Sequence, residues 1–325
     1  MLPVTSSGRS GLEAVVSAGY QLAAWAGGIL AEAENPAGER IAIGSADMAL
    51  LLVSLAICGW LVWKIRHNHP PLAYEGRRPV PWNGRDVTVA FVALYGSMIV
   101  FQGLLLNAYG VHLDAEPGLP DAVKPALLVA QSVAEVLVMV LTIALLARHR
   151  GAGPADFGLT RGHTRHDVAA GVIGFLFVLA PVSILYVMLK PEELHPLVEL
   201  VQRRPAQLWL IGFCAVVVAP LVEEFFFRVL LQGWLERWER DRQHAAHVQP
   251  ALPTGLVPIL ISAFFFAAMH AEQWPAPVPL FFLALVMGYL YHQTHRLLPS
   301  LVVHVCLNGA TFLNLWLAAG GPERK

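Results

Sequence analysis

The sequence predicts an all-α fold, a polytopic bundle of membrane-spanning helices. Of the 325 residues, 56% are hydrophobic and only 14% are charged, against about 25% charged in an ordinary soluble domain. The mean hydropathy is +0.56, and the charged residues cluster so that long uncharged runs separate them. These features exclude a disordered chain, a fibrous repeat and a typical soluble enzyme. A formal net charge of −1 offers no basic field for nucleic acid, so we expect no nucleic-acid partner.

Eight apolar runs are long enough for helices that cross a bilayer, because a crossing needs about 20 mostly apolar residues. They are too long and too uniformly apolar for barrel strands, which alternate over about 10 residues. The runs are 43–63, 87–109, 125–147, 168–189, 207–235, 254–271, 277–294 and 298–319.

The Ala- and Gly-rich residues 12–31 leave three interpretations open: a ninth crossing, an interfacial helix or a cleaved signal-like segment. Glu13 at the start of the run, preceded by the lone basic residue Arg9, favours an uncleaved helix. The Pro-rich stretch 69–81 is typical of an extended connector. The predicted organisation is an N-terminal helix or extension (1–45), a transmembrane pair with its connector (46–124) and the main membrane domain (125–319).

Basic residues are concentrated in alternate loops of this predicted bundle. These loops are 64–86, 148–166, 236–252 and the short one around Arg296. Because cytoplasmic loops carry an excess of Lys and Arg, we expect this face to be cytoplasmic. Short loops and an Ala- and Arg-rich composition indicate an integral protein of a prokaryotic inner membrane.

Three charged residues lie near the centre of the run 207–235, where an ionisable group is costly and is a functional hypothesis by default. Glu224 and Arg228 are four residues apart and share a helix face, so the spacing predicts an ion pair. Glu223 points about 100° away and lacks that partner, which suits it to general-base chemistry. The alternative at this point is that two structural glutamates share one arginine.

Two later runs carry further polar residues. His270 ends the run 254–271, where a lone histidine is commonly a packed or interfacial residue. His304 and Asn308 are four apart and share a face of the run 298–319. Such a pair is either a hydrogen-bond clamp between helices or a pair of donors for a developing oxyanion.

Other polar residues in the runs suggest structural roles. Glu135, with Gln131 one turn before it, is either a structural hydrogen-bonding group, which we favour, or a residue that lines a cavity. His292 and His295 end the run 277–294, and we expect their side chains to reach the membrane interface.

Three motifs together resemble a known family. Glu-Glu-x-x-x-Arg at 223–228, Phe-x-x-x-His at 266–270 and His-x-x-x-Asn at 304–308 occur in that order, each on a separate apolar helix. This resembles the CPBP family of CAAX proteases and bacteriocin-processing enzymes, also called the ABI family. Its eukaryotic relative is the type II CAAX prenyl endopeptidase. The resemblance covers roughly residues 125–318, so the main membrane domain is expected to be the catalytic one of an intramembrane endopeptidase.

The resemblance implies a role for each matched residue. Glu223 is expected to be the base that activates water, His270 to work beside it, and His304 with Asn308 to stabilise the oxyanion. Counting along the helices places Glu223 near mid-depth but His270 close to the far end of its run. The two residues therefore meet only if that helix begins deeper, is tilted or starts from a vestibule.

The remaining motif residues, Glu224 and Arg228, are expected to form an ion pair that shapes the site. A metal is the open alternative, because Glu223, His270 and His304 would make a legitimate three-ligand zinc set. The His/Asn pair and the adjacent ion pair favour a metal-free site. Zinc-bound histidines also need acceptors behind them, and the sequence neighbours of the two histidines offer no acceptor side chain. We therefore predict no cofactor, with zinc as the alternative.

Two other functions stay open. Intramembrane carboxylates, an arginine and histidines also describe a proton-coupled transporter, although the paired half-repeats typical of transporters are missing. A catalytically silent membrane scaffold or immunity protein would tolerate the loss of Glu223. For the protease, the expected partners are membrane lipid and a membrane-associated peptide or protein. The sequence does not decide whether that substrate is prenylated.

Overall fold

The computed structural model describes residues 45–110, 123–189, 208–246 and 253–318. Every regular element in these ranges is a helix, which confirms the all-α class. The open question about residues 12–31 lies outside the described residues.

All eight predicted runs form helices, although one run is divided into several elements. The elements are α2 (Ser45–Arg66), α3 (Gly84–Ala108), α4 (Lys124–Arg150), α5 (Thr164–Leu189), α7 (Leu208–Phe213), η3 (Cys214–Val218), α8 (Ala219–Glu224), η4 (Phe225–Gln232), α9 (Gly233–Ala246), α10 (Leu256–Ala268), η5 (Ala271–Gln273), α11 (Pro277–Thr294) and α12 (Leu297–Ala318).

Six helices of the described residues are long and apolar enough to cross a membrane, counting α7 to α9 as one. This confirms a polytopic membrane bundle. Helix α10 has only 13 residues, which span about 20 Å, less than the ~30 Å hydrocarbon core of a bilayer. The number of eight crossings therefore stays a prediction.

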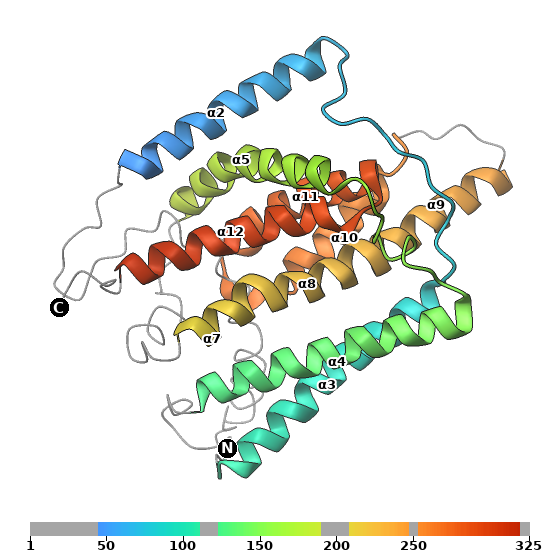
Figure 1. Cartoon of the computed structure of the whole chain (residues 1–325), viewed down its shortest axis with the longest axis vertical. Helices are drawn as coiled ribbons and strands as arrows, with labels where there is room; N and C mark the ends of the chain where they lie inside the picture. The colour runs from blue at the N-terminus through green and yellow to red at the C-terminus, as the bar shows by residue number, and fades with distance from the viewer. Residues whose placement is uncertain (1–44, 111–122, 190–207, 247–252, 319–325) are drawn as a thin grey trace, which may run out of the picture.

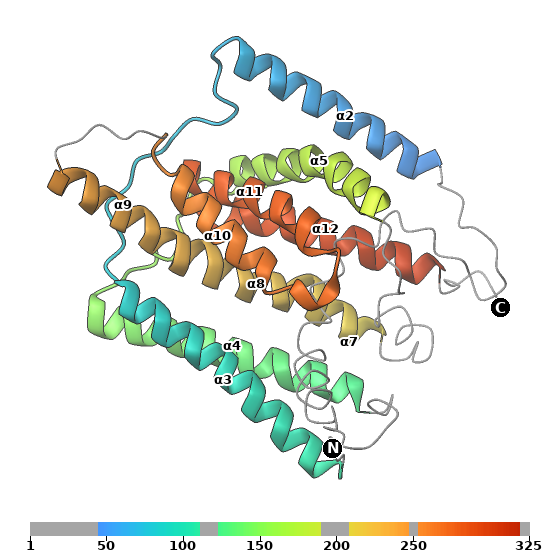
Figure 2. The same cartoon turned by 180° about the vertical axis from the view of Figure 1, so that it is seen from behind.

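The run from α7 to α9 forms one long composite helix at the centre of the molecule (Figure 1). The antiparallel pair α3 and α4 covers one side of it, and α10, α11 and α12 cover the other (Figures 1 and 2). Helix α5 packs on α11 and α12, and α2 is the outermost helix, against α5. The composite helix thus has protein on both sides, so polar side chains can lie along it away from lipid.

The predicted basic loops lie together at one end of the bundle. Arg78 forms an ion pair with Asp156 at 3.1 Å, and the Arg237 guanidinium donates to the Val80 carbonyl at 3.1 Å. Arg296 reaches back to the same connector, where it pairs with Glu75. These contacts confirm that the loops share one face. Its cytoplasmic orientation stays a prediction.

Helix α10 starts beside α9 and ends inside the bundle. The Gly255 N–H donates to the Glu239 carboxylate of α9 at 2.8 Å. Gly255 has φ +85°, and a Cβ there would lie 2.1 Å from the His292 ring, so only glycine fits this start. Since α10 is short, its end carries His270 to a depth inside the bundle. This explains how His270, at the end of its helix, can lie close to Phe266 and to the ring of His304, which Phe266 also contacts.

Candidate active site

The predicted ion pair between Glu224 and Arg228 is present and fully buried. Arg228 Nε donates to Glu224 Oε2 at 3.2 Å, and both side chains are 0% exposed. Arg228 Nη1 also donates to the Ser262 hydroxyl of α10 at 3.0 Å, and the guanidinium lies 5.1 Å from the Phe266 ring centroid. The pair therefore fixes α8 and η4 against α10.

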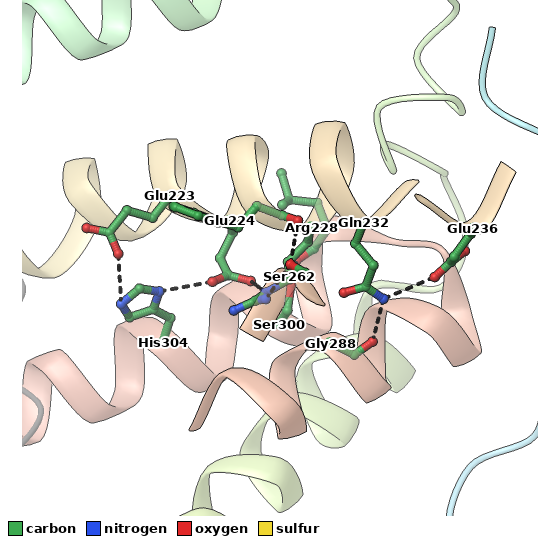
Figure 3. Close-up of polar contacts among 11 residues, drawn as sticks. Glu223, Glu224, Arg228, Gln232, Glu236, Ser262, Gly288, Ser300 and His304 are labelled. Atoms are coloured by element: carbon green, nitrogen blue, oxygen red, sulfur yellow. Dashed lines mark hydrogen bonds and ion pairs between the residues drawn. The ribbon is translucent and has the colours of Figure 1, made fainter. Parts of the chain in front are cut away.

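His304 lies between the two glutamates (Figure 3). Its Nδ1 is 3.1 Å from Glu224 Oε1, and its Nε2 is 3.7 Å from Glu223 Oε2. The Glu223 side chain is 22% exposed, whereas the His304 side chain is 4% exposed. Glu223 Oε2 has no hydrogen-bond partner among the described residues. Glu223 is thus the partly exposed end of a buried chain of charges.

Asn308 contacts the composite helix where the helix hydrogen bonding is interrupted. In the π-turn the Ala219 N–H bonds to the Cys214 carbonyl, five residues back. The next donor in that series would be residue 220, but Pro220 has no N–H. Asn308 Nδ2 donates to the freed Ala215 carbonyl at 2.9 Å. One amide hydrogen of Asn308 therefore has a structural task, and the second is left for another acceptor.

His270 belongs to the same region, with an aromatic ring between it and His304. Its Nδ1 lies 2.8 Å from the Phe266 carbonyl. The Phe266 ring centroid is 5.1 Å from the ring of His270 and 5.7 Å from that of His304. The two histidines are close enough to interact electrostatically. The structure therefore brings all three motifs together, although the roles of their residues stay predictions.

The alternative zinc set does not fit the described side chains. Among residues 45–110, 123–189, 208–246 and 253–318, no three His, Cys, Asp or Glu side chains are grouped so as to hold a metal ion. One argument from the sequence was nevertheless wrong. The histidines do have acceptors behind them, namely the Glu224 carboxylate and the Phe266 carbonyl. Sequence neighbours could not reveal them, because Glu224 comes from another helix.

The polar stripe on the composite helix extends further than predicted. It continues in steps of four residues, from Glu224 and Arg228 to Gln232 and Glu236 (Figure 3). Gln232 Nε2 donates to Glu236 Oε1 at 3.0 Å and to the Gly288 carbonyl at 2.9 Å. The i, i+4 spacing was the signal that could have revealed the two later residues. Ser262 could have been found as the one polar residue in the helix 256–268.

His292 and His295 are buried and do not reach the interface, so that expectation was wrong. They are 9% and 4% exposed, and their Nδ1 atoms lie 3.1 and 3.4 Å from the Glu236 carboxylate. Burial lowers the pKa of His295 to about 4. The reason for the error is that α11 ends beneath the connector that carries Tyr74, whose ring packs on both histidines.

Residues 205–310 match the model of the family described as type II CAAX prenyl endopeptidase, Rce1-like. No curated protein and no solved structure matches the chain. The matched region includes α7 to α11 and most of α12. It therefore contains every residue of the three motifs and the whole buried chain of charges.

Proposed function

We propose that this chain, which belongs to the CAAX protease family through residues 205–310, is an intramembrane endopeptidase. It hydrolyses a peptide bond near the terminus of a membrane-associated peptide or protein. The observation that carries this proposal is the partly exposed side chain of Glu223, whose Oε2 lies 3.7 Å from a histidine nitrogen. The other nitrogen of that histidine is fixed by a buried carboxylate–arginine pair.

The charge balance of the site indicates what His304 does. Glu224, ionised against Arg228, can only accept a hydrogen bond, so His304 Nδ1 carries a proton. With a second proton on Nε2, the four groups Glu223, Glu224, Arg228 and His304 have no net charge, which is the inexpensive state at this depth. The Nε2–H then points toward Glu223, where it can donate to an oxyanion.

His270 is suited to orient the water. The Phe266 carbonyl can only accept, so the 2.8 Å contact means that His270 Nδ1 carries the proton. The neutral ring then has Nε2 as an acceptor. An acceptor of this kind can hold a water while Glu223 removes its proton.

The steps of hydrolysis follow from these assignments. Glu223 takes a proton from water as the water oxygen bonds to the carbonyl carbon of the scissile peptide. The oxyanion accepts hydrogen bonds from His304 Nε2 and from the second amide hydrogen of Asn308. Glu223 then gives its proton to the leaving nitrogen, the C–N bond breaks, and the two products leave with Glu223 ionised again.

The substrate is expected to reach Glu223 from the bilayer. The surrounding helices are apolar and long enough to be embedded in it, so a membrane anchor on the substrate concentrates it where the site lies. Lipidated and single-span peptides both meet this requirement. The membrane itself, expected from the sequence to be a prokaryotic inner membrane, stays a prediction.

The direct test uses the full chain reconstituted in liposomes with membrane-anchored reporter peptides. Glu223→Gln should reduce cleavage by about 10²–10⁴-fold, the typical contribution of a positioned general base. Glu239→Gln is the matched control, because it changes a glutamate on the same composite helix whose carboxylate contacts Gly255. Turnover by the Glu223 variant close to that of the control would remove Glu223 as the base.

Substrate class is tested with one peptide sequence in three forms: prenylated at a C-terminal cysteine, anchored by a transmembrane segment, or soluble. We expect both anchored forms to be cleaved and the soluble form to be spared. Equal cleavage of all three would contradict the requirement for a membrane anchor.

Metal dependence is tested by prolonged dialysis against a chelator. We expect activity to persist and elemental analysis to find no stoichiometric metal. About one zinc per chain, with activity lost on chelation and restored by zinc alone, would instead make Glu223, His270 and His304 metal ligands.

A further inference from the structure

A second carboxyl group outside the three motifs lies on α4, which packs against the segment that carries Glu223. Glu135 on α4 is 9% exposed, and its Oε1 accepts from Gln131 Nε2 at 2.8 Å. Gln131 Oε1 in turn lies 3.3 Å from Gln102 Nε2 on α3. The two amides thus form a directed chain of donors that ends on Glu135, and neither of them carries a charge.

The packing register brings Glu135 level with the site. Leu128 of α4 packs with Ile211, Cys214 and Ala215 of the composite helix. Phe157, which follows the C-terminal end of α4, packs on Phe225 of η4, with 6.2 Å between the ring centroids. Helix α4 and the composite helix therefore run in the same direction. Glu135 is seven residues after Leu128, about 10 Å along the axis, which places it alongside α8. Helix α4 contacts η3 and α8 directly, and α8 carries Glu223.

The surroundings permit one negative charge on this pair. Two neighbouring carboxyl groups that both ionise repel each other, and at membrane depth water does not screen them. Glu223 faces His304 at 3.7 Å, whereas the hydrogen bonds of Glu135 come from a neutral amide. The titratable or charged groups of the packed elements around the pair are Cys214 (η3), Glu224 (α8), Arg228 (η4) and His304 (α12).

We propose that Glu135 is a positioning residue that keeps its proton, so that the single negative charge of the pair resides on Glu223, the base. This inference rests on the proposed function. When Glu135 does lose its proton at high pH, a second negative charge stands beside the scissile carbonyl and opposes formation of the oxyanion. Glu135 should therefore cause a loss of activity on the alkaline side of the pH profile.

The kinetic test compares the pH profile of kcat/KM for wild type and Glu135→Gln. Glutamine has nearly the same shape, can keep one hydrogen bond to Gln131 and cannot ionise. We expect the alkaline limb to move upward by about one pH unit or more, the size of coupling that separates two interacting sites. Thr142→Val is the control, because Thr142 is a buried residue on the same face of α4, two turns away. A Glu135→Gln profile that coincides with wild type would overturn the proposal.

A second measurement does not depend on proteolysis, so it separates failure of this inference from failure of the proposed function. Infrared spectra of the full chain at neutral pH should contain the C=O band of a protonated carboxylic acid. That band should be lost in Glu135→Gln. A band that persists in Glu135→Gln but disappears in Glu223→Gln would place the proton on Glu223 and overturn the proposal, whether or not a substrate has been found.

Discussion

Two arginines are buried in the part of the chain that the structure describes, and their surroundings differ in one respect. Arg228, at the centre, pairs with the single carboxylate of Glu224. Arg296, at the end where the basic loops gather, donates from Nε to Asp167 at 2.7 Å and from two nitrogens to Glu75. The hydrogen bond from Arg296 lowers the pKa of Glu75. Arg296 thus joins α12, the first turn of α5 and the connector after α2.

The difference indicates which cluster is built for structure and which for chemistry. The Arg296 cluster pairs one cation with two carboxylates and ties three segments together. In the Arg228 cluster, Arg228 Nη2 and Glu223 Oε2 have no hydrogen-bond partner among the described residues, whereas no buried side-chain atom of Arg296 or Asp167 lacks one. Unpartnered buried polar atoms are costly and uncommon in folded proteins. Under the proposed function, Glu223 Oε2 is the acceptor that is left for the attacking water.

The largest expected effect on stability comes from breaking the central pair. Arg228→Met leaves Glu224 buried without its cation, which should lower the free energy of unfolding by about 3–5 kcal/mol. Adding Glu224→Leu removes the stranded charge and should recover much of this loss. Thermal unfolding in detergent measures both variants. Unchanged melting of the single variant would show that the pair contributes no stability.

The sequence predicted the parts of the site that depend on one helix. The spacing of Glu224 and Arg228 sets their contact by helix geometry alone, and the structure contains it. The position of His304 between two carboxylates depends on how α12 packs against α8. The contact of Asn308 with Ala215 depends on a carbonyl that Pro220 and the π-turn leave free. No spacing rule within one segment gives either of these contacts.

The fold shows the same division between local and non-local information. Apolar length predicted the helices that can cross a membrane, and the alternation of basic segments predicted which of them share a face. The expected basic loop 236–252 was wrong in its first part, because α9 continues to Ala246. The short α10 was not predicted, since the run 254–271 continues past the helix end at Ala268. Likewise, His292 and His295 were expected at the interface because the connector that covers them is distant in sequence.

Replacing Arg296 should lower the free energy of unfolding by less than replacing Arg228. Arg296→Met strands Asp167, which is 2% exposed, but Asp167 lies in the first turn of α5, where the helix dipole favours a carboxylate. The side chain of Glu75 is 41% exposed, so water can solvate it. We expect a loss of about 1.5–3 kcal/mol, typical of hydrogen bonds to charged groups, with cleavage by the remaining folded protein intact. A lower rate of cleavage per folded molecule would contradict a purely structural role.

The smallest expected effect is a pH dependence of stability that arises from His295, at the same end of the bundle as Arg296. His295 is buried among Glu236, Arg77, Arg240 and His292, and burial lowers its pKa to about 4, against about 6.5 in an unfolded chain. Between these values the unfolded state binds the proton and the folded state does not. Neutral His295 is therefore compatible with the fold at pH 7, and stability falls as the pH drops from about 6.5 toward 4.

His295→Asn tests this dependence with little disturbance of the backbone. His295 has φ +50°, a left-handed conformation that asparagine tolerates better than most residues, and asparagine does not titrate. Between pH 7 and pH 5, wild type should lose roughly 1–2 kcal/mol more stability than the variant. Melting temperatures of both proteins at the two pH values, with cleavage measured in parallel, provide the comparison. His295 lies at the end of the bundle where the basic loops gather, away from the candidate active site. Cleavage per folded molecule should therefore not change. Parallel pH curves for the two proteins would show that Glu236 offsets the burial of His295 completely, whereas a loss of cleavage would extend the catalytic cluster to this end of the bundle.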